Sequence, residues 1–411
     1  MPDPHFTYPT TRREFLRQSA SGLGLIAFSS VAPAFLTHSV SAKVPKAEKD
    51  RSILVLIQLA GGNDGLNTVV PFEDDNYYRL RPKLGIQKKD LHVIDDQIGF
   101  HPGCSEMSEL YKNGDLAIIQ NVGYPNPNRS HFRSMEIWET GSKSNEFLTT
   151  GWLGRYFDNC CSGTPEEDPL ALGIGNDMPD VFLAGDAHNV FSLGASRGGA
   201  TGAPTGMVEA IRDGDYSAST NASFLQHTLM NTMVTERKVI ERLRGYNAMA
   251  EYPNSNLARN LKNVAALIAS GQETRVYFVS LGGFDTHANQ ETRHMALMRQ
   301  LSPAMAAFQA DLVAHGLDDQ VLTMTFSEFG RRPSENVSGG TDHGTAAPLF
   351  VMGSQLKGSL YGSAPDLNLQ KNKDMTYSTD FRSIYSTVIR RWFDADPKLV
   401  LDGKFKDIKF I

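Results

Sequence analysis

The sequence is poor in cysteine, and its cysteines do not make a complete set of pairs. They are Cys104, Cys160 and Cys161, and an odd number excludes a framework in which every cysteine is bridged. Adjacent cysteines rarely bridge each other, because the ring that they would close is strained. Two arrangements remain: Cys104 pairs with one of the other two, or all three are small buried residues. None of the spacings resembles a structural zinc site.

The sequence also lacks a long apolar run and an excess of basic charge. Its most apolar early stretch, Leu23–Leu36, is interrupted by Gly24 and Pro33 and is shorter than the roughly 20 residues that span a bilayer. No later stretch is longer, so we expect no transmembrane segment in the mature chain. The 411 residues carry a formal net charge of −6, which argues against nucleic acid as a partner, because that would require a basic face.

The N-terminal residues have the order of an export signal. The pair Arg12-Arg13 precedes the apolar stretch, and Val40-Ser41-Ala42 supplies small residues at a cleavage site. The alternative is an amphipathic N-terminal helix. We predict a twin-arginine signal over residues 1–42 and a periplasmic or secreted location. This pathway carries folded proteins, which often acquire a metal or cofactor inside the cell.

The remaining residues, 43–411, read as a single α/β domain. Little in/out alternation appears in the apolar runs, which is typical of strands buried on both faces. The expected strands are 52–60, 116–122, 275–281, 320–326 and 349–352, with helices over 223–244, 256–270 and 289–315. This order predicts a doubly wound, mostly parallel sheet with helices on both faces. Excursions from the domain are expected near 71–100 and 190–220.

Carboxylates follow three of the expected strands directly. Asp64, Asp285 and Glu328 each lie just past a strand's carboxyl end, and in a parallel sheet these ends share one edge, where ligands bind. Three converging carboxylates repel one another unless a cation lies between them. His287 and His343 add imidazoles, and mixed oxygen and nitrogen ligands suit zinc, manganese or iron. These five residues are therefore the candidate ligands of a divalent metal.

A candidate nucleophile lies where a helix begins after the strand 116–122. Ser130 opens that helix, whose N-terminus offers free N–H groups and a positive dipole end. Beside a metal, its hydroxyl could attack a phosphoryl or sulfuryl centre, with Arg129, His131 and Arg133 binding the anionic group.

Each of these residues also has a structural interpretation. Ser130 is a good helix N-cap, Asp64 could shape a turn, and Glu328 could pair with Arg331 or Arg332 at the surface. The joint position at strand ends favours the site.

Seven motifs identify the chain as a member of an exported bacterial family, domain of unknown function 1501. They are GGNDGLNTVVP (61–71), GYPNPNRSHFRSMEIWET (123–140), GWLGRYFD (151–158), FDTHANQ (284–290), FSEFGRRPSEN (326–336), GGTDHGTAAPLFVMG (339–353) and TDFRSIYSTVI (379–389). By the order and placement of these motifs, the family resembles the alkaline phosphatase and sulfatase superfamily. The resemblance implies an alkaline phosphatase-like fold.

The superfamily resemblance also implies roles for individual residues. The metal ligands would be Asp64, Asp285, His287 and His343, with Ser130 as the nucleophile. At the end of one strand an Asp-His pair is usual, and this chain has Ser327-Glu328-Phe329 instead, so Glu328 would take the ligand's place. The implied activity is metal-dependent hydrolysis of a phosphate or sulfate ester, with a small anionic ester as substrate. The alternative is a non-catalytic binding or assembly protein that holds a cell-envelope component in the same groove.

Overall fold

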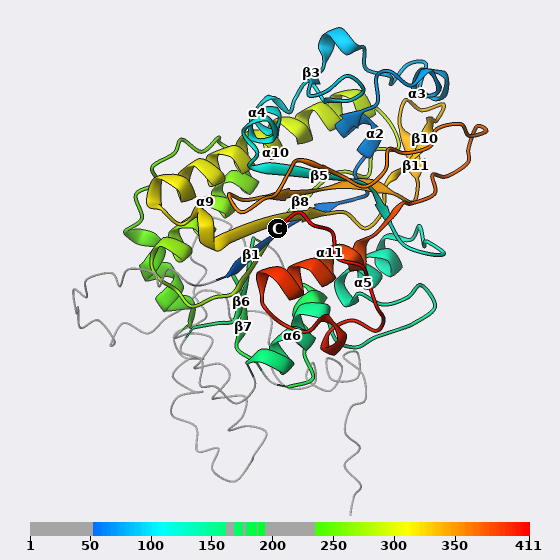
Figure 1. Ribbon diagram of the computed structural model, residues 1–411. Helices are drawn as coiled ribbons and strands as arrows, with labels where there is room; N and C mark the ends of the chain where they lie inside the picture. The colour runs from blue at the N-terminus through cyan, green and yellow to red at the C-terminus, as the bar shows by residue number, and fades with distance from the viewer. Residues whose placement is uncertain (1–51, 162–167, 176–177, 187, 194–234) are drawn as a thin grey trace, which may run out of the picture. The chain divides into compact units, whose positions relative to one another are not determined.

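The computed structural model describes residues 52–161, 168–175, 178–186, 188–193 and 235–411 (Figure 1). The chain divides into two compact units, one of residues 1–41 and 196–238, the other of residues 42–195 and 239–411. The second unit contains the sheet described below. The predicted signal over 1–42 lies outside the described residues.

The second unit is built on a mostly parallel nine-stranded sheet. Its order is β13-β5-β12-β9-β1-β8-β6-β7, with β14 also paired to β5. The strands are β1 (Ile53–Ala60), β5 (Leu116–Gly123), β6 (Ala171–Ile174), β7 (Val190–Leu193), β8 (Val276–Gly282), β9 (Val321–Phe326), β12 (Ala347–Met352), β13 (Leu360–Tyr361) and β14 (Thr379–Asp380). Among the described strands of this sheet, β12 alone runs antiparallel to both of its neighbours. The α/β fold class and the mostly parallel sheet are thus as predicted.

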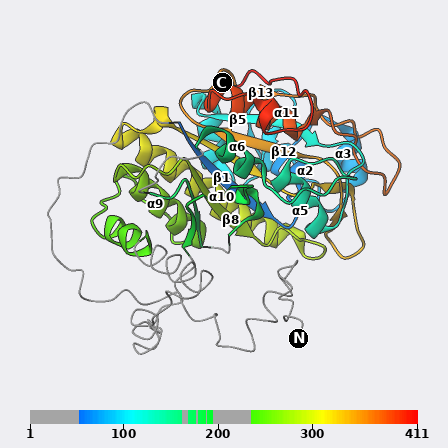
Figure 2. The same ribbon diagram turned by 90° about the horizontal axis from the view of Figure 1, so that it is seen from below.

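Helices cover both faces of this sheet (Figures 1 and 2). Alternate side chains of β1 face opposite sides: Ile53, Val55 and Ile57 belong to one core cluster and Leu54 and Leu56 to the other. The first cluster packs against α4 (Ser105–Asn113), α9 (Asn256–Ala269) and α10 (Gln290–His315). The second packs against α5 (His131–Thr140), α6 (Trp152–Cys160) and α11 (Phe381–Thr387).

The long helices begin and end at residues suited to those positions. The Ser255 hydroxyl accepts a hydrogen bond from Ala258 N at the start of α9. α10 ends at Gly316, whose φ of +66° is left-handed, and it continues through Pro303 without interruption. The helix predicted over 223–244 lies partly outside the described residues, and its described part, 235–244, is helical.

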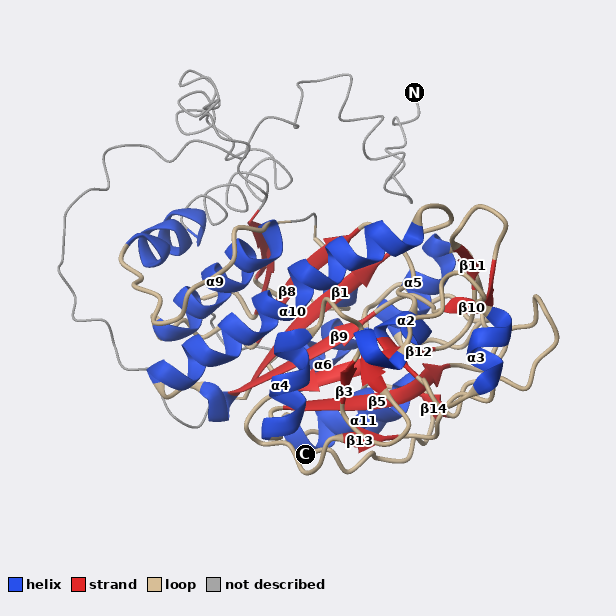
Figure 3. Ribbon diagram, turned by 90° about the horizontal axis from the view of Figure 1, so that it is seen from above, coloured by secondary structure: helices blue, strands red, loops and turns tan. Residues whose placement is uncertain are grey.

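Shorter elements lie beside the main sheet (Figure 3). The segment expected as an excursion over 71–100 contains α3 (Asp75–Leu80) and the strands β3 (His92–Val93) and β4 (Gly99–Phe100). With β2 (Val69–Val70), these strands form a small separate sheet, next to α2 (Gly65–Thr68). β10 (Arg331–Glu335) and β11 (Thr341–His343) form an antiparallel hairpin. The second predicted excursion, 190–220, begins with β7 and otherwise lies outside the described residues. Short 3-10 helices span 88–90, 180–182, 318–320 and 397–399, and a π-helix spans 388–392.

The cysteines differ from the expectation. Cys160 and Cys161 form a disulfide with each other, while Cys104 is buried and free. The prediction that adjacent cysteines do not bridge is wrong here. The two residues lie where α6 ends: Cys160 is its last residue, and Cys161 leaves the helical conformation. Within the described ranges, no helix combines the length and apolar character needed to cross a membrane.

Candidate metal centre at the carboxyl edge of the sheet

The site is formed where three neighbouring parallel strands end. β1 pairs in parallel with β8 on one side and with β9 on the other, so Asp64, Asp285 and Glu328 reach one edge of the sheet, as the strand pattern predicts. The turns there are close: a Cβ on Gly61, whose φ is +120°, would lie 2.4 Å from Asp285 N. Glycine at position 61 therefore allows the ends of β1 and β8 to approach each other.

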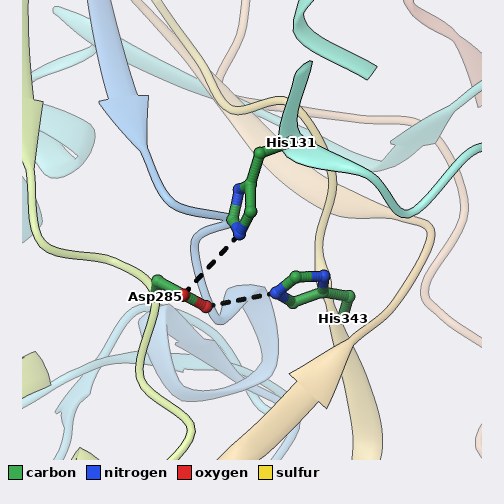
Figure 4. Close-up of side chains that lie close together, drawn as sticks. All are labelled: His131, Asp285 and His343. Atoms are coloured by element: carbon green, nitrogen blue, oxygen red, sulfur yellow. Dashed lines mark hydrogen bonds and ion pairs between the residues drawn. The ribbon is translucent and has the colours of Figure 1, made fainter. Parts of the chain in front are cut away.

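Three side chains from separate segments converge at this edge (Figure 4). Among the described residues, His131, Asp285 and His343 form a group whose ligand atoms all lie within 4.8 Å of one another. Asp285 Oδ1 is 3.2 Å from His343 Nε2, and Asp285 Oδ2 is 3.7 Å from His131 Nε2. The Asp285 side chain is 47% exposed, so the group is open to solvent.

His287 approaches the same group. Its Nε2 lies 3.1 Å from Asp285 Oδ1 and 3.0 Å from His343 Nε2. These three atoms thus form a triangle with sides of 3.0–3.2 Å. In a tetrahedral zinc site with nitrogen ligands, two ligand nitrogens lie about 3.3 Å apart, because each Zn–N distance is about 2.0–2.1 Å.

The other ring nitrogen of each histidine faces an oxygen that can only accept. His131 Nδ1 is 2.8 Å from Glu328 Oε1, His287 Nδ1 is 3.3 Å from Asp342 Oδ1, and His343 Nδ1 is 2.8 Å from the Arg129 carbonyl oxygen. Each Nδ1 must therefore carry a proton and donate it. In the neutral imidazole this leaves the Nε2 lone pair free, and all three Nε2 atoms point toward Asp285.

The three Nε2 atoms and the Asp285 carboxylate thus lie together as acceptors, and none of the three Nε2 atoms carries a proton. Burial lowers the pKa of His343, so extra protonation of that ring is disfavoured. Partial burial alone would raise the pKa of Asp285, but the hydrogen bond from Arg331 and the positive charge of that guanidinium outweigh it and hold the value at about 2. Asp285 is therefore ionised, and the donor set fits a divalent cation of the zinc, manganese or iron type.

The segment Glu328-Phe329 supports the histidines. Glu328 Oε1 accepts from Gly61 N as well as facing His131, so the carboxylate is fixed on both sides. The Phe329 ring packs against two imidazoles, with centroid distances of 4.9 Å to His131 and 4.6 Å to His343. Both residues that replace the expected Asp-His pair thus contact these imidazoles from outside the triangle.

Arg331 was considered in the sequence only as a possible partner of Glu328. It is buried and donates instead to Asp285 Oδ1 at 2.6 Å. It also donates to the carbonyl oxygens of Gly62, Phe284 and Thr341. Its guanidinium therefore fixes the Asp285 carboxylate and joins the turns after β1 and β8 to strand β11. In the sequence, the position of Arg331 shortly after the end of β9 is the feature from which its place at the site could have been inferred.

A family model described as "Protein of unknown function (DUF1501)" matches residues 51–390. The match includes all of the site residues described above. The chain belongs to the DUF1501 family. No curated protein matches this DUF1501 chain significantly.

Several solved structures are similar in fold to this DUF1501 protein. The C-terminal periplasmic domain of EcEptC from Escherichia coli has 10% identity and a TM-score of 0.37, with 75% of each chain covered. The lipoteichoic acid synthase LtaP from Listeria monocytogenes has 7% identity and a TM-score of 0.37, covering 75% of this chain and 67% of that one. The PsFucS1 sulfatase from Pseudoalteromonas sp. has 11% identity and a TM-score of 0.38, covering 87% and 70%.

Asp64 lies at the same edge of the sheet but has other partners. It is 1% exposed, and its two oxygens accept from Arg81 Nη1 at 2.7 Å and Nη2 at 2.9 Å. Gln290 Nε2 donates to it as well. Burial alone would raise the pKa of Asp64, but the Arg81 charge and hydrogen bonds bring it below the ordinary value. Arg81 comes from the loop after α3 and was not singled out in the sequence.

The residues predicted around the nucleophile have separate roles. Ser130 is the N-cap residue of α5, yet its hydroxyl makes no capping hydrogen bond, and the residue is exposed. His131, predicted to bind substrate, belongs to the group of side chains around Asp285 that could hold a metal. The guanidinium of Arg129 pairs with Asp374. Arg133 pairs with Glu136 and donates to carbonyl oxygens of residues 143, 144 and 146, which makes it a structural residue of that loop.

Proposed function

We propose that this DUF1501 protein is an exported, metal-dependent hydrolase of phosphate or sulfate esters. The observation that carries the proposal is the set of three Nε2 atoms directed at Asp285, each left free because its own Nδ1 donates to an oxygen. Paired in this way to a carboxylate or carbonyl oxygen, an imidazole has the tautomer and orientation of a metal ligand. Solvent access to Asp285 leaves room for a substrate.

In this proposal His131, Asp285, His287 and His343 hold one divalent metal. The metal would polarise the ester and lower the pKa of a nearby hydroxyl. Glu328 keeps His131 in the required tautomer, and Asp342 does the same for His287. Asp64 is left out of the ligand set, because both of its oxygens are engaged by Arg81.

Ser130 is the proposed nucleophile. It precedes His131 directly, and its hydroxyl is free of the capping bond that would otherwise explain it. Its Oγ forms a bond to phosphorus or sulfur while the bond to the ester oxygen breaks, and its proton ends on the departing alcohol. Water then hydrolyses the seryl ester and restores the hydroxyl.

Export through the twin-arginine pathway remains part of the proposal and has its own test. The variant Arg12→Lys with Arg13→Lys should leave the precursor in the cytoplasm, as seen by cell fractionation and immunoblotting. Normal processing and export of the double variant would refute the twin-arginine route and leave the chemistry untouched.

The test of the activity uses metal-loaded and chelator-treated protein with p-nitrophenyl phosphate and p-nitrophenyl sulfate. We expect metal-loaded wild type to hydrolyse one of them, and both chelation and Ser130→Ala to abolish turnover. Metal-loaded protein that cleaves neither ester would favour the alternative, a binding or assembly protein on the same fold. Activity that persists in Ser130→Ala would transfer the nucleophile's role to water.

A further inference from the structure

A single carboxylate joins two arginines beside the candidate metal centre. Asp374 Oδ2 lies 3.0 Å from Arg129 Nη1, and Asp374 Oδ1 lies 3.3 Å from Arg332 Nε. All three side chains are partly exposed, at 43% for Arg129, 26% for Asp374 and 23% for Arg332. Two positive charges therefore share one negative partner in contact with solvent.

Both arginines are connected to the metal centre through their backbone. The Arg129 carbonyl oxygen accepts from His343 Nδ1, and Ser130 and His131 follow it in the chain. Arg332 follows Arg331, whose guanidinium binds Asp285. Each arginine is thus next in the chain to a residue at the ligand set, or contacts it through its carbonyl oxygen, so the backbone of both lies at the edge of the sheet that holds Asp285.

The segment that carries Asp374 is fixed on both sides. Asn372 N donates to Ser334 Oγ at 3.1 Å, and the Thr345 hydroxyl donates to the Met375 carbonyl oxygen at 2.5 Å. Asp374 is thus held against the arginines by its neighbours as well as by charge.

Another carboxylate, Asp342, lies near Arg332. Partial burial would raise the pKa of Asp342, but hydrogen bonds from Asn336 and His287 and the charges of His287 and Arg332 lower it. Asp342 has its hydrogen-bond partners in Asn336 and His287, so Asp374 is the carboxylate that directly pairs with the two arginines.

We propose that Arg129 and Arg332 form the anion-binding subsite for the phosphate or sulfate group of the substrate, and that Asp374 occupies this subsite until the substrate displaces it. The inference rests on the proposed function. Guanidinium groups match the oxygens of phosphate and sulfate. Exposed Arg–Asp pairs contribute little, so a substrate anion can replace Asp374 readily. Asp374 then acts as an internal competitor that sets the affinity for anions.

The chain contains a matched control for this arrangement. Asp407 also joins two arginines, with its Oδ2 3.0 Å from Arg390 Nε and 3.8 Å from Arg391 Nε. These arginines lie beside Trp392, whose indole N–H donates to the carbonyl of Ile53 at the start of β1. This second bridge therefore lies toward the opposite edge of the sheet from the metal centre.

The experiment titrates inorganic sulfate and inorganic phosphate into chelator-treated full-length protein by calorimetry, because binding to arginines needs no metal. Asp374→Asn should bind at least one of the anions about fivefold more tightly than wild type. Arg332→Gln should lose that binding, and Asp407→Asn should match wild type. Metal content, measured on the same samples before chelation, should be unchanged in Asp374→Asn.

Unchanged anion affinity in Asp374→Asn, or an equal gain in Asp407→Asn, would overturn the subsite. So would persistent binding in an Arg332→Gln protein that melts at the wild-type temperature. A wild-type sample without bound metal would refute the proposed function instead, which separates the two failures.

Discussion

Two carboxylates at one edge of the sheet, Asp64 and Asp285, have opposite environments. Asp64 is 1% exposed and forms a two-fold contact with Arg81, so its charge is neutralised inside the protein. Asp285 is 47% exposed and has one arginine and three imidazole nitrogens near it. Both carboxylates follow the end of a strand, but the side chains that contact them differ.

This difference shows why a carboxylate at a strand end is not sufficient evidence of a metal ligand. A buried ion pair with satisfied oxygens stabilises the loops that it joins. A carboxylate next to unprotonated ring nitrogens keeps coordination capacity. We therefore propose a structural role for Asp64 and a ligand role for Asp285. The predictions below test that division, ordered by the expected change in free energy.

The largest effect is expected from breaking the buried pair. Arg81→Met leaves the Asp64 charge without its partner, so the free energy of unfolding should fall by about 3–5 kcal/mol. Urea unfolding followed by circular dichroism measures the change. Lys83→Met, an exposed neighbour, is the control and should stay within about 0.5 kcal/mol of wild type. Equal stability of Arg81→Met and wild type would contradict the structural role of Asp64.

A pH effect should arise from two buried histidines behind Asp64. Burial lowers the pKa of His294 from 6.5 to about 4 and that of His101 from 6.5 to about 3, and their rings lie 5.1 Å apart. The unfolded chain therefore binds these protons at a higher pH than the folded protein. Stability from this source is complete above pH 6.5 and falls as the pH drops toward 4.

His294 should account for about 2–3 kcal/mol of that loss. Urea unfolding of metal-free wild type and His294→Gln between pH 7 and pH 4 isolates its share as the difference between the two slopes. A wild-type profile as flat as that of the variant would show that His294 takes up its proton equally in both states.

A smaller change is expected at the metal centre. Asp342→Asn removes the carboxylate that orients His287, and metal affinity should fall about tenfold to a hundredfold, while the metal-free protein keeps its stability. Competition with a coloured chelator measures the affinity. Asp319→Asn, an exposed carboxylate on the 3-10 helix before β9, serves as the control. If Asp342→Asn lost fold stability but kept its metal affinity, Asp342 would have a structural role like that of Asp64.

The smallest change in stability is expected at Ser130. Because its hydroxyl makes no capping bond, Ser130→Ala should stay within about 0.5 kcal/mol of wild type and lose its turnover. Ser130→Asp should be inactive too, since its carboxylate cannot form the same ester intermediate. Melting temperature and ester hydrolysis are measured on both variants. Full activity in Ser130→Asp would leave position 130 without a catalytic role.

The sequence was most informative where regular structure determines position. The apolar runs predicted β1, β8 and β9 to within a residue or two, and their parallel pairing brings Asp64, Asp285 and Glu328 to one edge. Neither the antiparallel direction of β12 nor the position of β1 between β8 and β9 follows from hydrophobicity, because buried strands of either direction have similar composition.

The side chains that contact the site residues could not be predicted from the sequence. Arg81 and Asp64 are 17 positions apart, and Arg331 and Asp285 are 46 apart. Each arginine lies beyond intervening helices and strands, and no periodicity in the sequence relates it to its carboxylate. The histidine tautomers depend on such contacts as well, since Glu328 and Asp342 reach their rings from other segments. The disulfide between Cys160 and Cys161 depends on local backbone geometry at the end of α6.

Metal stoichiometry tests the division between the two carboxylates most directly. Elemental analysis of wild type, His343→Ala and Asp64→Asn, each loaded with zinc and then freed of excess ion, gives the number of ions per folded chain. The account predicts one ion in wild type, one in Asp64→Asn and none in His343→Ala. An ion that is kept by His343→Ala and lost by Asp64→Asn would contradict it.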